Sequence, residues 1–349
     1  MTSVAIGTRA IGGGAPCFVI AEAGVNHNGD LDMALQLVDV AAAAGADAVK
    51  FQTFSADTLV APSAPQFPYT LGRGEGSVSQ HEMLRRLELP HDWHDPLRAR
   101  CETAGLLFLS TPFHESDADW LLAFGVPALK IPSGEVTNLP FLRHVAAMGV
   151  PIIASTGMAT LAEVDEMVST IRDAGAPPLV LLHCVSDYPA NPTDANLRAM
   201  HTMRQAFQLP VGFSDHTDGI DISLAAVALG ADVIEKHFTL DRTLPGPDHR
   251  ASLAPAELSA LVAGIRRVES ALGTGVKQPA AVELATRTCV RKSLVVARPL
   301  AEGAIVASDD LATRRPGDGL SPDTARWIVG RRLRRAVTAG HVLREDDLA

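Results

Sequence analysis

Short, uninterrupted apolar runs alternate with longer amphipathic segments along the chain from residue 17 onward. The apolar runs predict eight strands, at residues 17–23, 48–54, 106–111, 128–132, 151–156, 179–185, 211–214 and 233–237. The other segments have apolar residues at helical spacing and predict helices at residues 32–44, 80–103, 116–124, 139–148, 161–174, 196–207, 220–229 and 255–272. Because the strands are apolar throughout rather than at alternate positions, both faces should be buried, as in a parallel sheet.

Eight strand-helix units in about 260 residues match a (β/α)8 TIM barrel in number and in size. A doubly wound open sheet is the alternative, although such a sheet usually has fewer units and a glycine-rich first turn. The barrel has a corollary, which is that the residues that do chemistry should lie at the carboxyl ends of the strands.

The last part of the chain has a different pattern. Residues 274–290 contain few large apolar side chains and are expected to link a barrel domain, residues 1–273, to a small domain, residues 291–349. The small domain contains an internal repeat, in which LAEGAIVASDDLA at 300–312 returns as VTAGHVLREDDLA at 337–349. A pseudo-symmetric β-rich module is expected, with a core so small that it should dock on something else.

Composition narrows the class of protein. The 349 residues carry a formal net charge of −10, which argues against a nucleic-acid partner because binding phosphates requires a basic face. No apolar run is long enough for a membrane span, and the N-terminus lacks a signal-peptide pattern, so a cytoplasmic protein is expected. The four cysteines form no CxxC pair, which favours reduced thiols over a disulfide frame or a zinc knuckle.

Two histidines, His216 and His237, come at or just after the ends of the last two expected strands. Imidazole suits manganese, zinc or iron, and a site with two histidines leaves positions open for water and substrate oxygens. Each histidine could instead simply form a hydrogen bond inside the barrel mouth. The pair favours a metal site, but it does not select the metal.

Lysine and serine side chains gather at other strand ends. Lys50, Lys130, Ser155, Ser186 and Ser214 supply the charges and short donors that a phosphate or carboxylate ligand requires. Serines alone could satisfy loops, but buried ammonium groups without an anion are expensive. An anion site is therefore predicted.

Carboxylates at the same edge are candidates for proton transfer. Glu22 and Glu135 could each act as a general acid or base, or pair with the lysines, and Glu22 is preferred because it directly ends the first strand. Asp248 lies in LPGPDH, where the prolines stiffen a loop after the His237 strand. This loop indicates either a ligand for a substrate hydroxyl or a plain turn.

Eight motifs in this order carry a family resemblance. They are FVIAEAGVNHNGDLDMALQLVDVAAAAGADAVKFQTF, FLSTPF, KIPSGE, STGM, LLHCVSDYP, GFSDHT, EKHFTLDRTLPGPDH and RRPGDG. From about residue 16 to its end the chain closely resembles the sialic acid synthases and their relatives that make legionaminic and pseudaminic acids. The small domain resembles the C-terminal antifreeze-like (SAF) domain of that family.

The resemblance implies an N-acetylneuraminate synthase-like transferase that condenses phosphoenolpyruvate with the open-chain aldehyde of an N-acetylated amino sugar, giving a nonulosonic acid and phosphate. It implies a divalent metal on His216 and His237, usually Mn²⁺, with Mg²⁺ or Co²⁺ as alternatives, and Glu22 as the catalytic acid or base. Arg315 matches the arginine that the SAF domain of one protomer inserts into its partner's barrel, which implies a domain-swapped homodimer. The phosphoenolpyruvate positions implied are Lys50, Lys130, Ser133, Ser155, Ser186 and Ser214, with Gln52, Thr111, Glu135, Tyr188 and Asp248 near the site and the sugar.

The chain departs from the family pattern at one point. Sialic acid synthases themselves have asparagine at the position of Ser186 and a larger apolar residue at that of Asp187. The motif CVSDYP resembles other branches of the family more closely, so the acceptor can be N-acetylmannosamine, a diacetamido-trideoxyhexose or another specialised sugar. Two other functions stay open, namely a Schiff-base aldolase that uses Lys50 or Lys130 on the same barrel, and a non-catalytic sugar-binding or ice-binding protein, which the small domain alone would suggest.

Overall fold

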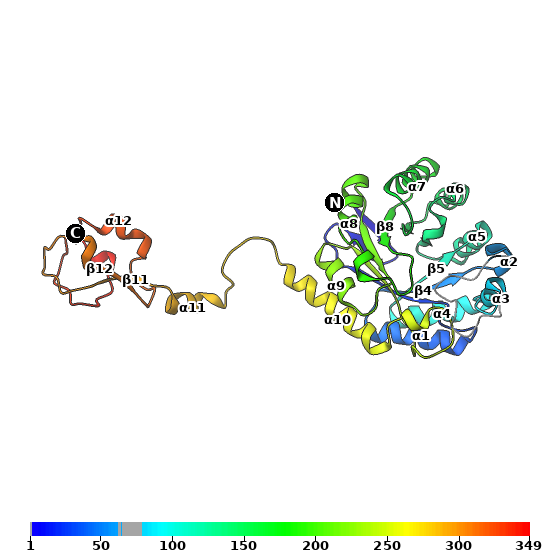
Figure 1. Cartoon of the computed structure of the whole chain (residues 1–349), viewed down its shortest axis with the longest axis horizontal. Coiled ribbons are helices and arrows are strands. Elements are labelled where there is room, and N and C mark those ends of the chain that lie inside the picture. Colours follow the sequence, from blue (N-terminus) through cyan, green and yellow to red (C-terminus); the bar gives the residue numbers. More distant parts are fainter. Residues whose placement is uncertain (1, 62–63, 65–78) are drawn as a thin grey trace. The chain divides into compact units, whose positions relative to one another are not determined.

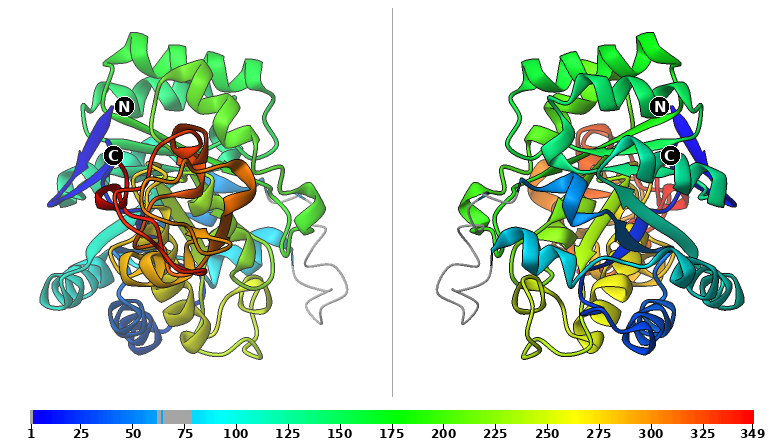
Figure 2. Two further views of the ribbon diagram at one scale, coloured as in Figure 1. Left: turned by 90° about the vertical axis from the view of Figure 1, so that its left-hand side faces the viewer. Right: turned by 90° about the vertical axis from the view of Figure 1, so that its right-hand side faces the viewer.

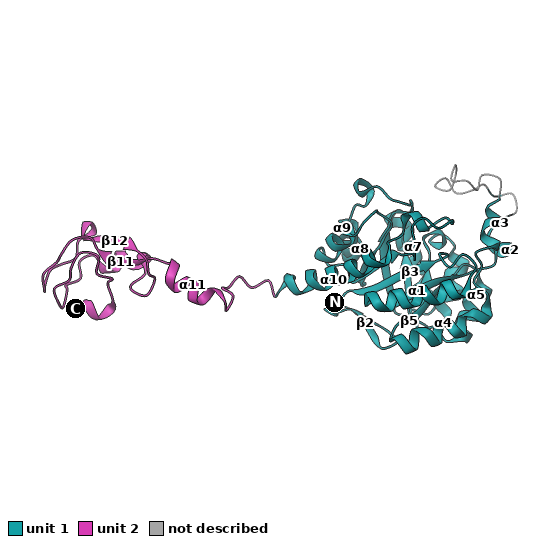
Figure 3. Cartoon of the chain, turned by 90° about the horizontal axis from the view of Figure 1, so that it is seen from below, with its two compact units in different colours: residues 1–273 teal, residues 274–349 magenta. Residues whose placement is uncertain are grey.

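The computed structural model describes residues 2–61, 64 and 79–349. The chain divides into two compact units, residues 1–273 and residues 274–349, which are considered one at a time (Figure 3).

The first unit is built on a parallel eight-stranded sheet that curls into a barrel (Figure 1). The order of its strands is β5-β4-β3-β10-β9-β8-β7-β6, and the end strands β5 and β6 contact each other, which nearly closes the barrel. The strands are β3 (Phe18–Gly24), β4 (Ala48–Thr53), β5 (Leu107–Pro112), β6 (Leu129–Ile131), β7 (Ile152–Ser155), β8 (Leu179–Cys184), β9 (Val211–Asp215) and β10 (Val233–His237). The barrel prediction is confirmed.

Helices surround the strands and bury them on their outer side (Figure 2). They are α1 (Leu31–Ala44), α4 (His91–Ala104), α5 (Glu115–Phe124), α6 (Leu139–Ala147), α7 (Leu161–Ala174), α8 (Ala199–Phe207), α9 (Asp221–Ala228) and α10 (Pro255–Leu272). The prediction of one helix at 80–103 is wrong, because α3 (Gln80–Arg85) ends before Pro90, which caps α4 in an extended conformation. A proline disfavours helical geometry in the residue before it, so one helix cannot run through this point. A further short helix, α2 (Ala56–Leu59), precedes α3.

A hairpin that the sequence pattern did not predict closes the floor of the barrel. It consists of β1 (Ser3–Ile6) and β2 (Arg9–Gly12), drawn in dark blue in Figure 2. Its Ile6 and Ile11 are fully buried in one cluster with residues from the amino ends of the strands, including Phe18. The barrel interior is therefore apolar at the floor, and its polar residues lie toward the opposite end.

The second unit contains α11 (Glu283–Val290), β11 (Ser293–Val296), β12 (Leu311–Arg314) and α12 (Ala325–Ile328). Residues 274–290, expected to be linker, thus include a helix. The internal repeat is visible in the structure: Arg298 Nε donates to Asp310 Oδ1 at 2.7 Å, and Arg335 Nε donates to Asp347 Oδ1 at the same distance. In both copies the buried aspartate also caps a short helical turn. Among the described residues of the whole chain, no helix combines the length and the apolar character that crossing a bilayer requires.

Candidate active site

A cavity of about 780 Å³ opens at the carboxyl ends of the barrel strands. Most residues predicted for the site line it: Glu22, Lys50, Gln52, Thr111, Lys130, Ser133, Ser155, Ser186, Tyr188, Ser214, His216, His237 and Asp248. Glu135 is not among the lining residues, because its carboxylate is turned toward Asn138, whose Nδ2 donates to it at 2.6 Å. Arg315 belongs to the second unit, and its role stays a prediction.

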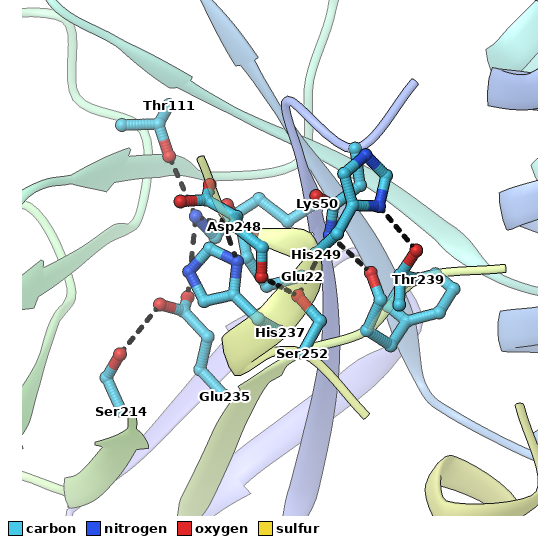
Figure 4. Close-up of polar contacts among 12 residues, drawn as sticks. Glu22, Lys50, Thr111, Ser214, Glu235, His237, Thr239, Asp248, His249 and Ser252 are labelled. Atoms are coloured by element: carbon cyan, nitrogen blue, oxygen red, sulfur yellow. Dashed lines mark hydrogen bonds and ion pairs between the residues drawn. The ribbon is translucent and has the colours of Figure 1, made fainter. Parts of the chain in front are cut away.

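Two lysines and two glutamates form a buried charged cluster at the base of the cavity. Figure 4 labels three of the four, namely Glu22, Lys50 and Glu235. Lys50 Nζ lies 2.7 Å from Glu22 Oε2 and 3.6 Å from Glu235 Oε2, and it donates to Thr111 Oγ1 at 3.0 Å. Lys130 Nζ lies 3.3 Å from Glu235 Oε1. The two ammonium groups and the two carboxylates balance each other when all four are charged.

The two carboxylates of this cluster differ in their proton affinity. Burial raises the pKa of Glu22 to about 7, although Lys50 opposes the shift. Burial would also raise the pKa of Glu235, but Lys130 and Lys50 outweigh it and lower that pKa to about 2. Glu22 can therefore exchange a proton near neutral pH while Glu235 stays ionised, and such a divergence is typical of an acid and its electrostatic partner.

Glu235 received no role from the sequence, although it lies in the same cavity beside both lysines. Its side chain also accepts a hydrogen bond from Ser214 Oγ at 3.0 Å, so it joins both lysines to β9. The alternation of side chains in a strand could have identified it, because a residue two positions before an inward-facing His237 faces inward as well.

His216 and His237 lie side by side, with ring centroids 5.7 Å apart. His216 Nδ1 lies 2.6 Å from the carbonyl oxygen of Val185, which can only accept, so Nδ1 carries the proton and Nε2 keeps its lone pair. Burial lowers the pKa of His216 to about 4 and that of His237 well below its usual range. Both rings are therefore neutral, which is the form that binds a metal.

The same two rings fit a divalent metal in other respects. His237 Nδ1 is buried with no hydrogen-bond partner among the described residues, and it lies 3.9 Å from Asp248 Oδ2. No group of three or more metal-ligating side chains is present in residues 2–61, 64 and 79–349, so two imidazoles would hold the ion and leave positions for water or substrate.

Serine hydroxyls surround a point at which the chain has no side chain. The amide of Gly157 donates to Ser133 Oγ at 2.9 Å, and a Cβ at Gly157 would lie only 2.8 Å from both Ser133 Oγ and Cys184 Sγ. Ser186 Oγ would be closer still, and Ser155 Oγ is buried without a hydrogen-bond partner in the described structure. The unpartnered Ser155 hydroxyl, in a cavity that also contains two buried lysines, suits an anionic oxygen ligand.

A hydrogen-bond brace holds the loop that presents Asp248 (Figure 4). Asn26 Nδ2 donates to Ser252 Oγ at 3.0 Å, and Ser252 Oγ donates to the carbonyl of Asp248 at 2.7 Å. His249 lies between Thr239 Oγ1 at 2.6 Å and Asn28 Oδ1 at 3.1 Å. Burial raises the pKa of the Asp248 carboxyl to about 6. The backbone of Asp248 is thus held at the cavity wall, and its carboxyl, when ionised, can accept a hydrogen bond from a ligand hydroxyl.

Part of the cavity lining is apolar. It consists of five residues, which together are named the apolar wall: Leu59 at the end of α2, Val60 directly after it, Met83 and Leu84 of α3, and Phe113 directly after β5. The cavity therefore combines a charged base with a wall suited to hydrocarbon groups.

Comparison with known proteins agrees with this geometry. The model described as the NeuB family matches residues 37–277, and that of the SAF domain matches residues 291–349. The chain is 48% identical over 341 residues to N,N'-diacetyllegionaminic acid synthase from Legionella pneumophila, covering 97% of this chain and 96% of that protein. It is 44% identical over 329 residues to the Campylobacter jejuni protein of the same name, covering 94% and 98%. The solved N-acetylneuraminic acid synthetase from Leptospira borgpetersenii, in complex with citrate, superimposes with a TM-score of 0.72 at 38% identity, covering 82% of this chain and 95% of that one.

Proposed function

The chain belongs to the NeuB family, and from this premise we propose that it is a metal-dependent nonulosonic acid synthase. It condenses phosphoenolpyruvate with the open-chain aldehyde of an N-acetylated amino sugar and releases phosphate. The observation that carries this function is the meeting of Lys50, Lys130, Glu22, His216 and His237 in one cavity. An anion site, an acid and a pair of neutral imidazoles are the parts that such a condensation requires.

Phosphoenolpyruvate is the anion that the base of the cavity would bind. Its phosphate and carboxylate would take the ammonium groups of Lys50 and Lys130, with hydroxyls of Ser133, Ser155 and Ser186 as further donors. Lys50 is held by Glu22 in the free protein, so the incoming anion competes with a carboxylate for the same ammonium.

Glu22 would supply a proton during the condensation. C3 of phosphoenolpyruvate forms a bond to the aldehyde carbon of the sugar, and the aldehyde oxygen takes the proton of the Glu22 carboxyl. The ionised Glu235 would stabilise the positive charge that develops at C2. Water would then add at C2 and give its proton back to the Glu22 carboxylate, and the C2–O bond to phosphate would break as the remaining hydroxyl proton passes to the departing phosphate, leaving the 2-keto acid.

His216 and His237 would hold the divalent metal, with Mn²⁺ proposed. When bound there, the ion would act as a Lewis acid that polarises the aldehyde oxygen and orients water.

We infer that the acceptor is a 2,4-diacetamido-2,4,6-trideoxyhexose rather than N-acetylmannosamine. The apolar wall, with Leu59, Val60 and Phe113, suits the methyl of a 6-deoxy sugar and the methyl of a second acetamido group. The relatives named for N,N'-diacetyllegionaminic acid support the same acceptor class. A hydroxylated C6 would lose hydrogen bonds to water against such a wall.

We propose further that the protein works as a domain-swapped homodimer in the cytoplasm. Arg315, an exposed residue of the SAF domain, would reach the acceptor in the partner's barrel. The small core of the SAF domain supports docking on a larger body.

The test is the release of phosphate from phosphoenolpyruvate with Mn²⁺ and each of N-acetylmannosamine, 2,4-diacetamido-2,4,6-trideoxymannose and 2,4-diacetamido-2,4,6-trideoxyaltrose, with and without chelator. Chelator-sensitive release with a diacetamido sugar is expected. Phosphate release with N-acetylmannosamine alone would refute the acceptor assignment. If folded, metal-loaded protein releases no phosphate with any of the three sugars, the proposed synthase activity is refuted. Covalent trapping by borohydride and pyruvate, with activity retained in chelator, would establish the lysine aldolase instead.

A further inference from the structure

Two charged residues of the barrel are fully buried outside the cavity. The side chains of Asp215 and Lys236 are each at most 1% exposed. The two residues are direct partners in the register of β9 and β10. Because successive side chains alternate, both point to the outer face of the sheet, where Ser223 of α9 donates to Asp215 Oδ2 at 2.5 Å. The proposed reaction leaves this ion pair without a role.

Lys236 contacts the residues on both sides of His216. Its Nζ lies 2.9 Å from Asp215 Oδ2 and donates to the carbonyl oxygen of Thr217 at 2.5 Å. Asp215 Oδ1 in turn accepts from the amide of Thr217 at 2.8 Å and from its hydroxyl at 2.7 Å. Lys236 on β10 therefore holds the residues before and after His216 in place, and it directly precedes His237 in the chain.

A gain in folding stability does not by itself explain why the buried Asp215–Lys236 ion pair is present. Removing an ammonium and a carboxylate from water is expensive, and apolar residues of similar volume often stabilise a core equally well. What an ion pair with fixed hydrogen bonds adds is a defined geometry between the two strands. The two residues whose geometry it would define are the neighbouring histidines.

We propose that the Asp215–Lys236 ion pair is a positioning element that sets the relative placement of His216 and His237 for a divalent metal ion. This role rests on the proposed function, in which the two histidines bind the metal. The pair touches neither the metal nor the substrates, and it acts through the backbone of β9 and β10. Metal sites depend on such supporting residues, whose loss typically weakens metal affinity about 10- to 100-fold.

A second ion pair, between Arg204 of α8 and Asp232 just before β10, provides a matched control at the other end of the same two strands. Arg204 Nη2 lies 2.8 Å from Asp232 Oδ2 and donates to the carbonyl of Val211, and Asp232 Oδ2 accepts from the amide of Val211. This pair joins the amino ends of β9 and β10, whereas the histidines lie at the carboxyl ends. A purely structural loss at either pair would loosen the same strands.

The experiment measures Mn²⁺ binding to the full-length, metal-free protein by calorimetry, without substrates. The double variant D215N/K236M is used because its neutral side chains have similar shapes and leave no unpaired buried charge. Its dissociation constant is expected to rise about 10- to 100-fold, while R204M/D232N stays within about twofold of wild type. Circular dichroism and melting curves establish that both variants are folded at the temperature of the titration.

Two results would overturn the positioning role: unchanged Mn²⁺ affinity in folded D215N/K236M, or an equal loss in R204M/D232N. The variant His237→Ala separates this outcome from a failure of the proposed function. If His237→Ala binds Mn²⁺ as wild type does, the histidines are not the metal site and both ideas fall. If His237→Ala loses binding while D215N/K236M keeps it, only the positioning role is lost.

Discussion

The charge balance of the lysine–carboxylate cluster predicts that phosphoenolpyruvate binding takes up a proton at Glu22. In the free protein Lys50 Nζ lies 2.7 Å from Glu22 and 3.6 Å from Glu235. A multiply charged anion that binds the Lys50 ammonium would lie close to the Glu22 carboxylate, which contacts the same ammonium. Two negative groups so close together repel each other, and this raises the pKa of the carboxylate that can take up a proton. Glu22 is that group, because the lysines hold the pKa of Glu235 at about 2.

The magnitude follows from the pKa of Glu22, which burial raises to about 7 in the free protein. If phosphoenolpyruvate binds only to protein in which Glu22 is protonated, raising the pH lowers the fraction of protein that can bind it. The affinity for phosphoenolpyruvate therefore falls as the pH rises. The dissociation constant should increase about tenfold from the low-pH limit to pH 8 and about a hundredfold to pH 9, which is about 1.4 kcal/mol per pH unit. The neighbouring His216 does not contribute, because its pKa of about 4 keeps it neutral throughout this range.

The assay is calorimetric titration with phosphoenolpyruvate between pH 7 and pH 9, in buffers with different ionisation heats that count the protons taken up. Glu22→Gln replaces the carboxylate with a neutral amide, so its dissociation constant should be flat with pH and about tenfold below that of wild type at pH 8. Thr111→Val is the matched control, because it removes a neutral group bonded to Lys50 and should keep the wild-type slope. A flat wild-type profile, or a sloping profile in Glu22→Gln, would refute the reasoning.

Three further predictions concern other parts of the site. Gly157→Ala should raise the Michaelis constant of phosphoenolpyruvate at least tenfold with an unchanged melting temperature, because its Cβ would lie 2.8 Å from Ser133 Oγ; saturation kinetics like those of wild type would contradict the anion site. His237→Ala should abolish Mn²⁺-dependent phosphate release while leaving the circular dichroism spectrum unchanged, and full turnover would exclude the metal role. Arg315→Ala should raise the Michaelis constant of the sugar more than that of phosphoenolpyruvate in steady-state assays, and the reverse order would mean that the arginine serves the other substrate.

The sequence predicted the barrel because its strands are continuous apolar runs whose ends carry the polar residues. The expected strand at 233–237 and β10 have the same bounds: Val233 and Ile234 at its start are buried, and His237 at its end lines the cavity. The hairpin β1–β2 was missed because its strands are only four residues long and contribute few apolar side chains. Such a pattern resembles a loop until the floor that it covers is known.

Within the site, residue type and position at a strand end were enough to predict that the lysines and histidines line the cavity. They were not enough to predict which groups the carboxylates contact. Glu135 follows a strand as Glu22 does, yet a short helical turn at Ser133–Glu135 carries its side chain away to Asn138. Glu235 stands two residues before His237 on the same expected strand but was given no role of its own. Which carboxylate contacts which ammonium depends on register across four strands, and no local pattern encodes that register.

The apolar wall and the charged cluster belong to different parts of the chain, and this has a consequence for how the protein can evolve. The wall is contributed mainly by α2 and α3, in the connection between β4 and α4, whereas the four charges project from β3, β4, β6 and β10. If the wall selects the acceptor as proposed, a change of acceptor can arise from substitutions in α2 and α3, whereas replacing one of the four charged residues leaves an opposite charge unpaired in the interior. The acceptor, and with it the product sugar, could thus change through substitutions in the apolar wall that leave the four charged residues of the proposed reaction in place.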